Sequence, residues 1–149
     1  MNKVQIVAPN NVYTVWNDVE SFLNASINIS GGDITIDQLK LILARGEQTL
    51  LVSTDDKGKL NGAMTVEFQN LPNNRVMFIT ALGGNGIVNN ETFEQVENWA
   101  RMQGATKVSA WAQESQARLY KIKANFNTVR MVVEKDLWNY LTCLIGFKT

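Results

Sequence analysis

The segment from Val76 to Leu82 constrains the fold of this chain most strongly. It reads Val-Met-Phe-Ile-Thr-Ala-Leu, so a single hydroxyl interrupts an otherwise apolar run. A run of this length without alternation is typical of a central β-strand that is covered on both faces. Covering both faces requires a layered protein with helices on each side of a sheet.

The residues before this strand predict two helices. Val12, Trp16, Val19, Leu23 and Ile27 recur at helical spacing, which indicates an amphipathic helix over residues 12–28. A second helix is expected to start at Asp33 or Thr35 and to end near Gly46, because these residue types favour helix caps.

Strands are expected on both sides of these helices. A first strand is predicted at residues 4–8, and three consecutive strands at residues 49–54, 63–68 and 76–82. The turns between the last three, Asp55–Lys59 and Leu71–Asn74, are rich in turn-forming residues. Three strands joined by tight turns predict an antiparallel meander.

The second half of the chain continues with alternating helices and strands. A helix containing Phe93, Val96 and Trp99 is expected to end near Gly104 and to be followed by a strand at residues 106–113. A short helix beginning at Ser115 and a last strand at residues 128–137 complete the pattern. Two strands joined through a helix are parallel, so residues 76–82 and 106–113 are expected side by side.

These elements predict one α/β domain over residues 1–137, with a mixed twisted sheet in the order β-α-α-β-β-β-α-β-α-β and flanking helices. Residues 138–149 form an apolar tail. For this tail, a seventh strand, a packed end and a docking surface all remain open.

Composition excludes several classes of function. The 149 residues include 14 basic and 14 acidic side chains, so no electrostatic signature of nucleic-acid binding is present. No apolar run reaches the roughly 20 residues of a membrane span. The absence of histidine removes His-based triads and the usual zinc sites, and no metal site is expected. The single cysteine, Cys143, fits a packed thiol in a reducing, cytoplasmic compartment.

One local motif is more specific than the element order. Ser115, Ala117, Leu119-Tyr120 and Asn125-Phe126 occupy the positions of a small cap, an alanine, a Leu-Tyr pair and a Gly-Phe pair. With this motif and its element order, the chain resembles the GNAT acetyltransferase superfamily over essentially its whole length. Its Gly83-Gly84, Trp99-Ala100, Gly104-Ala105 and Lys135-Asp136-Leu137 are similar to features of the compact GNAT-like proteins of tailed bacteriophages.

The resemblance implies an acetyl-CoA-dependent N-acetyltransferase that modifies a small-molecule or protein amine. Acetyl-CoA would lie where the two parallel strands separate, with its pyrophosphate on backbone N–H groups that open the third helix. It implies a tyrosine, here Tyr120, as the general acid, and a base or an ordered water that removes the proton of the amine. Glu67 is the candidate base, because it alternates with Val66 and Phe68 on a strand near the central one. The implied cofactor-binding residues are Ala81, Leu82, Gly84, Asn85, Gly86 and Ile87.

Each of these roles has a purely structural alternative. The glycines also suit a tight turn without a ligand, and no Lys or Arg occurs between Val76 and Glu97 to hold a phosphate. Tyr120 is equally explained as a helix-edge residue with a packed ring, and Glu67 as an exposed carboxylate on a strand.

A second class of function therefore stands beside the enzyme. The chain would then be a catalytically inactive GNAT-fold protein of a phage virion or host-takeover system, located in the host cytoplasm or the virion. It would act through protein–protein contacts, with residues 138–149 binding another subunit or a virion partner.

Overall fold

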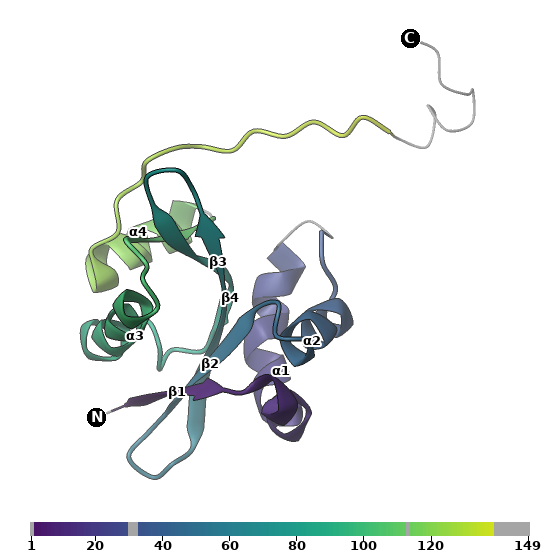
Figure 1. The fold of residues 1–149 in the computed structure, drawn as a ribbon, viewed down its shortest axis with the longest axis vertical. Coiled ribbons are helices and arrows are strands. Elements are labelled where there is room, and N and C mark those ends of the chain that lie inside the picture. Colours follow the sequence, from purple (N-terminus) through teal and green to yellow (C-terminus); the bar gives the residue numbers. More distant parts are fainter. Residues whose placement is uncertain (1, 30–32, 113, 139–149) are drawn as a thin grey trace.

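The computed structural model describes residues 2–29, 33–112 and 114–138. The described residues form five strands, four α-helices and one 3-10 turn (Figure 1). Their bounds are β1 Lys3–Val7, η1 Pro9–Asn11, α1 Val12–Ile29, α2 Ile36–Ala44, β2 Thr49–Thr54, β3 Leu60–Asn70, β4 Arg75–Gly83, α3 Asn90–Met102, β5 Lys107–Ala110 and α4 Glu114–Ala124.

The strands form one mixed sheet in the order β1-β2-β3-β4-β5. The first four strands pair antiparallel with their neighbours. β4 and β5 pair in parallel, as the helix between them requires. The expected single α/β domain with a mixed sheet and flanking helices is therefore confirmed.

Helices cover both faces of this sheet. Figure 1 shows α1 and α2 on one side, called here the α1/α2 face, and α3 and α4 on the other, called the α3/α4 face. Alternation along the strands divides the core in the same way, since Ala63 packs with α1 and α2 while Met64 packs with α3. The predicted helical stripe of α1, which contains Val12, Trp16 and Leu23, is buried on the α1/α2 face.

The helix starts follow the sequence signals closely. Thr35 caps α2, because its side chain accepts from Gln38 N while the Gln38 side chain accepts from Thr35 N. The sequence left Asp33 and Thr35 open, and the structure selects Thr35. Asn89 caps α3 by accepting from Thr92 N at 2.9 Å.

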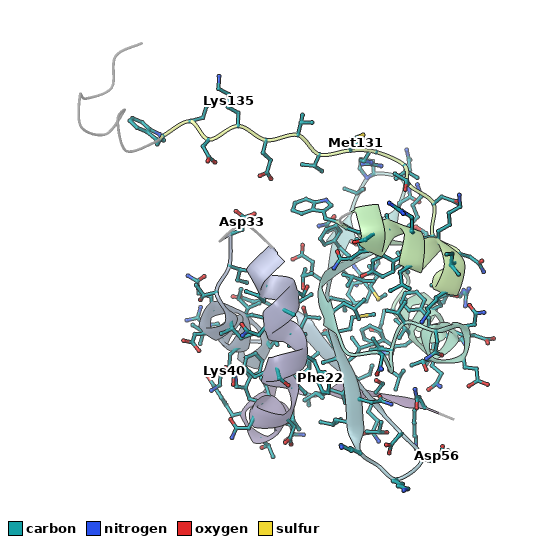
Figure 2. All side chains as sticks on the ribbon, turned by 180° about the vertical axis from the view of Figure 1, so that it is seen from behind. Phe22, Asp33, Lys40, Asp56, Met131 and Lys135 are labelled. Carbon is teal, nitrogen blue, oxygen red and sulfur yellow. The ribbon has the colours of Figure 1, made fainter. Side chains whose placement is uncertain are left out.

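The last strand was predicted wrongly. Residues 127–136 have no regular secondary structure, and Val129, Met131 and Val133 are exposed. Figure 2 shows the extended segment running away from the body, with Met131 and Lys135 on it. Valine-rich sequence favours an extended backbone, but a strand also needs a partner ladder, and within the described residues none is paired with it.

β5 is also shorter than the expected 106–113, since it ends at Ala110. The following residue, Trp111, is 69% exposed. Residues 139–149 of the predicted tail lie outside the described part of the chain.

Candidate active site

The pairing of the two parallel strands, β4 and β5, ends just before Ala81 and Leu82, which the sequence predicts to bind the cofactor. β4 pairs with β5 only from Val76, opposite Lys107, to Ile79, opposite Ala110. β4 nevertheless continues to Gly83 alongside β3. Its last four residues therefore have no strand partner on that side among the described residues, and this edge of β4, next to the end of β5, is called here the gap.

A β-bulge lies at the same point. Thr65 of β3 opposes Ala81, whereas the next residue, Val66, opposes Ile79. Thr80 is thus the extra residue on β4. A bulge bends its strand and redirects a side chain, and bulges are common beside functional sites.

The redirected Thr80 belongs to a partly buried polar network. Its hydroxyl donates to Gln48 Oε1 at 2.7 Å and lies 2.6 Å from the hydroxyl of Thr65, which is fully buried. Gln48 Nε2 in turn donates to Glu67 Oε2 at 3.4 Å, and Gln69 Nε2 donates to Glu67 Oε1 at 3.0 Å. The sequence offered no reason to connect Gln48, Thr65 and Thr80, although Thr80 was the one polar residue in the apolar run.

Glu67 is therefore held in place by two amides. It alternates with Val66 and Phe68, which pack on the α3/α4 face, so its side chain lies on the α1/α2 face. Within the described residues no cation is paired with it, and both amide donors are neutral. These two hydrogen bonds hold the Glu67 carboxyl group at a fixed position near the bulge.

Ala81 and Leu82 lie where β4 borders the gap. Ala81 is buried on the α1/α2 face. Leu82 donates its backbone N–H to Ser26 Oγ of α1 at 3.3 Å. This N–H belongs to a strand but donates to a side chain and not to a neighbouring strand. A serine hydroxyl can rotate away, which would leave the N–H free for another acceptor.

The glycines after β4 have a packing role. A Cβ on Gly83 would collide with the backbone oxygen of Phe22 in α1, and one on Gly84 would collide with the backbone oxygen of Asn61. Gly84 also has φ +83°, which favours glycine. The structure thus gives a reason for two of these glycines that requires no ligand.

The rest of this loop is folded against the start of β3. Gly86 donates its N–H to Asn61 O at 3.1 Å, and its carbonyl accepts from Asn2 Nδ2 at 3.0 Å. Ile87 is fully buried, while Asn85 is exposed. Of the N–H groups expected to meet a pyrophosphate, that of Gly86 is already used within the protein.

The N-terminus of α3 offers few groups to an anion. The side chain of Asn89 takes up Thr92 N, and Glu91 adds a negative charge in the first turn. The hydroxyl of Thr92 is buried without a hydrogen-bond partner among the described residues. The helix dipole favours an anion at this end, but the carboxylate opposes it.

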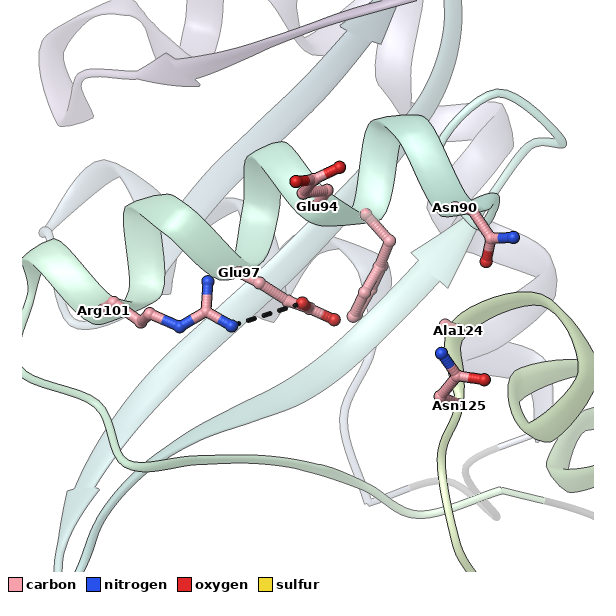
Figure 3. A pocket seen from close by; sticks show the side chains of 7 residues that line it. Asn90, Glu94, Glu97, Arg101, Ala124 and Asn125 are labelled. Carbon is pink, nitrogen blue, oxygen red and sulfur yellow. Dashed lines mark ion pairs between the residues drawn. The ribbon is translucent and has the colours of Figure 1, made fainter.

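A cavity of about 290 Å³ lies between α3 and the end of α4. Glu94, Glu97 and Arg101 of α3 line it together with Ala124 and Asn125, which are drawn in Figure 3. Arg101 is paired with Glu97 at 3.7 Å, so its charge is already balanced. Two carboxylates and one neutralised arginine make this cavity unsuitable for phosphates.

Tyr120 lies on the α3/α4 face, opposite to Glu67. Its ring packs against Phe126 with the centroids 5.2 Å apart. Burial raises the pKa of the Tyr120 phenol from 10.0 to about 12. Tyr120 therefore stays protonated at neutral pH, and its hydroxyl has no partner within residues 2–29, 33–112 and 114–138.

The helix that carries Tyr120 is followed by a residue with a positive φ angle, a conformation that usually requires glycine, although the residue here is asparagine. Asn125 replaces the glycine of the Gly-Phe pair and adopts φ +59°. Asparagine tolerates this left-handed conformation better than other side-chain-bearing residues. The N–H of Phe126 then reaches the carbonyl of Tyr120 at 3.3 Å.

No family model matches the chain, and no curated protein matches it in sequence. Solved structures do match it. One is an aminoglycoside acetyltransferase from an uncultured soil metagenomic sample, in complex with sisomicin, with 12% identity and a TM-score of 0.65 over 92% of this chain and 97% of that chain. Another is a predicted acetyltransferase from Clostridium acetobutylicum, solved with acetyl-CoA, with 14% identity and a TM-score of 0.61 over 92% and 97%.

A third is the aminoglycoside 6'-N-acetyltransferase from Acinetobacter baumannii, with 13% identity and a TM-score of 0.60 over 93% of this chain and all of that chain. The chain has the GNAT acetyltransferase fold. At this level of identity the GNAT likeness establishes the fold alone. The bacteriophage part of the sequence resemblance has no support in these comparisons.

Proposed function

We propose that this GNAT-fold protein is an acetyl-CoA-dependent N-acetyltransferase acting on a primary amine, and that it works in the cytoplasm. The observation that carries the proposal is the separation of β4 from β5 after Ile79, at a bulge lined by polar side chains. A strand edge without its neighbour offers backbone donors to an extended, amide-containing chain, such as the arm of this cofactor. No helix within the described residues is long and apolar enough to span a membrane.

The two ends of the cofactor fit this site unequally. Ala81 and Leu82 border the gap and would hold the acyl end, with the Leu82 N–H, which now donates to Ser26 Oγ, as an available donor. Gly84, Asn85, Gly86 and Ile87 would meet the pyrophosphate only through N–H groups other than that of Gly86. Bound acetyl-CoA supplies an acetyl group activated as a thioester.

The reaction requires one proton to leave the amine and one to reach the departing sulfur. Glu67 would accept the proton that the amine nitrogen loses. Tyr120 remains protonated at neutral pH and would supply the proton that the departing thiolate needs. Tyr120 packs on the α3/α4 face and Glu67 lies on the α1/α2 face, so the acid and the base would act from opposite sides of the sheet.

Calorimetric titration with acetyl-CoA tests the proposal. We expect saturable binding of one molecule per chain, and release of free thiol when an amine is added. Tyr120→Phe should lower turnover at least tenfold with little change in cofactor affinity, because the phenol acts only on the leaving sulfur. Absence of binding at millimolar acetyl-CoA would reject the enzyme.

A second candidate is a non-catalytic GNAT-fold protein that acts by protein–protein contact. Two observations favour it: the loop after β4 is filled by its own contacts, and Val129, Met131 and Val133 are exposed on one extended segment. Removing residues 128–149, which contain this segment and the apolar tail, should then abolish self-association or partner binding in light scattering while the domain remains folded. A truncated protein that still assembles would count against this candidate.

A further inference from the structure

An unpaired carboxylate and two aromatic rings form a continuous row on the α1/α2 face. Glu67 of β3 lies directly opposite Phe78 of β4 in the sheet register. Directly opposite residues have Cβ atoms about 5 Å apart, so the side chains of Glu67 and Phe78 leave the sheet side by side on this face. The Phe78 ring packs edge-on against Trp111, with centroids 5.3 Å apart and planes at 77°.

This row lies beside the gap. Phe78 is the residue before Ile79, the last residue of β4 that pairs with β5, and Trp111 is the first residue after β5. The two rings and Glu67 therefore approach the place proposed for the acyl group from the α1/α2 face. Sequence reasoning missed both aromatic residues, because their contact depends on the register between β4 and β5.

The carboxylate and the aromatic rings of this row both favour a cationic ligand. Glu67 accepts hydrogen bonds from Gln48 and Gln69, both neutral, and among the described residues no Lys or Arg neutralises it. Each carboxylate oxygen keeps further acceptor capacity. The faces of tryptophan and phenylalanine also attract cations. An ammonium group is the ligand that satisfies the carboxylate and the rings together.

The same row limits what the ammonium group is attached to. Trp111 is 69% exposed, so its indole offers apolar area that a ligand can cover. The row contains one carboxylate, which matches one cationic group rather than several. A carbon skeleton that packs on the indole gains free energy that a heavily hydroxylated one does not.

We propose that Glu67, Phe78 and Trp111 form the acceptor subsite, and that this subsite takes a single primary ammonium group on an apolar or aromatic carbon skeleton. This subsite rests on the proposed acetyltransferase function, because an acceptor has a role only in that reaction. Its test does not depend on that function, because amine binding is measured without the cofactor. Glu67 holds the ammonium group and then accepts one of its protons, and Trp111 positions the skeleton.

The experiment compares phenethylamine with its neutral analogue, 2-phenylethanol, by saturation-transfer NMR on the protein without cofactor. We expect the amine to bind at least tenfold more tightly than the alcohol, since a hydrogen bond to a charged group is worth roughly 1.5–3 kcal/mol. Glu67→Gln, which keeps the shape of the side chain, should remove this preference. Trp111→Ala should weaken both ligands several-fold. Asp18→Asn on the exposed surface of α1 is the matched control and should change neither.

Equal affinity for amine and alcohol, or a preference that survives Glu67→Gln, would overturn the subsite. If the amine fails to bind while acetyl-CoA still titrates, the subsite is wrong and the acetyltransferase proposal stands. If the amine binds with the expected dependence on Glu67 while acetyl-CoA does not, the subsite stands and the enzyme proposal is wrong.

Discussion

The gap between β4 and β5 and the loop that follows β4 are adjacent in the chain but differ in character. At the gap, Leu82 N–H donates to a serine hydroxyl, and the Glu67 carboxyl group accepts from two neutral amides. In the loop, Gly83 and Gly84 leave no room for a methyl group, and Gly86 N–H is bonded to Asn61. The gap keeps polar groups available to a ligand, whereas the loop uses its own to hold β4 against α1 and β3.

The largest effect is expected from filling the loop. Gly83→Ala places a methyl group against the backbone oxygen of Phe22, and backbone cannot move aside as a side chain can. We expect a loss of about 3 kcal/mol or more in the free energy of unfolding, measured by urea denaturation.

The control for this variant is Gly58→Ala. That position has no atom within 4 Å of an added Cβ and has φ +80°, so only backbone strain of about 1 kcal/mol is expected. Equal losses at the two positions would show that Gly83 is not packed as described.

The second effect concerns Tyr120 and pH. Its pKa is raised from 10.0 to about 12 by burial, so between these values the unfolded chain ionises while the folded chain does not. The contribution of this burial is complete below pH 10 and is lost as pH rises to about 12, by about 2 kcal/mol. Denaturation at pH 9 and pH 11.5 measures it.

Tyr120→Phe should remove most of this alkaline loss, whereas Tyr13→Phe, at a side chain 58% exposed, should retain it. If the two variants lose stability alike, Tyr120 is not buried in the α3/α4 face.

A third effect separates the two ends of the cofactor site. S-acetylpantetheine has the acyl arm but no diphosphate or nucleotide. Because the loop contributes few free donors and α3 begins with Glu91, kcat/KM for this donor should lie within about tenfold of that for acetyl-CoA, equivalent to about 1.4 kcal/mol. A thousandfold loss would mean that the loop and α3 do hold the phosphates.

The smallest effect is expected in the extended segment. Val133 is 88% exposed, so Val133→Asp should change the free energy of unfolding by no more than about 0.5 kcal/mol. Val66→Ala, in the buried part of β3, should cost about 2 kcal/mol in the same assay. A large cost at Val133 would show that residues 128–137 pack against the sheet after all.

Local sequence signals were sufficient for most of the fold. Burial could be predicted from the apolar pattern alone, both for the run from Val76 to Leu82 and for the helical stripe of α1. The parallel pairing of β4 and β5 could be predicted because a helix connects them. The run from Thr128 to Leu137 was predicted as a strand because its residues have high β-propensity. That propensity favours an extended backbone, but it does not show whether a neighbouring strand is present to pair with.

The candidate site was less predictable because its contacts join residues that are distant in sequence. Gln48 reaches Thr80 across 32 positions, and this meeting depends on the bulge that shifts the register after Thr65. Phe78 and Trp111 meet only because β4 and β5 align as they do. Single residues such as Glu67 could be named from alternation, but their partners could not.

The most direct measurement is a map of backbone amide shifts in ¹⁵N-labelled protein titrated with acetyl-CoA. We expect the largest shifts at Thr80, Ala81, Leu82 and Ala110, where the pairing of β4 with β5 ends, and smaller ones at Gly86, whose N–H is already bonded. Shifts confined to the cavity between α3 and α4, or no shifts at millimolar cofactor, would contradict this expectation.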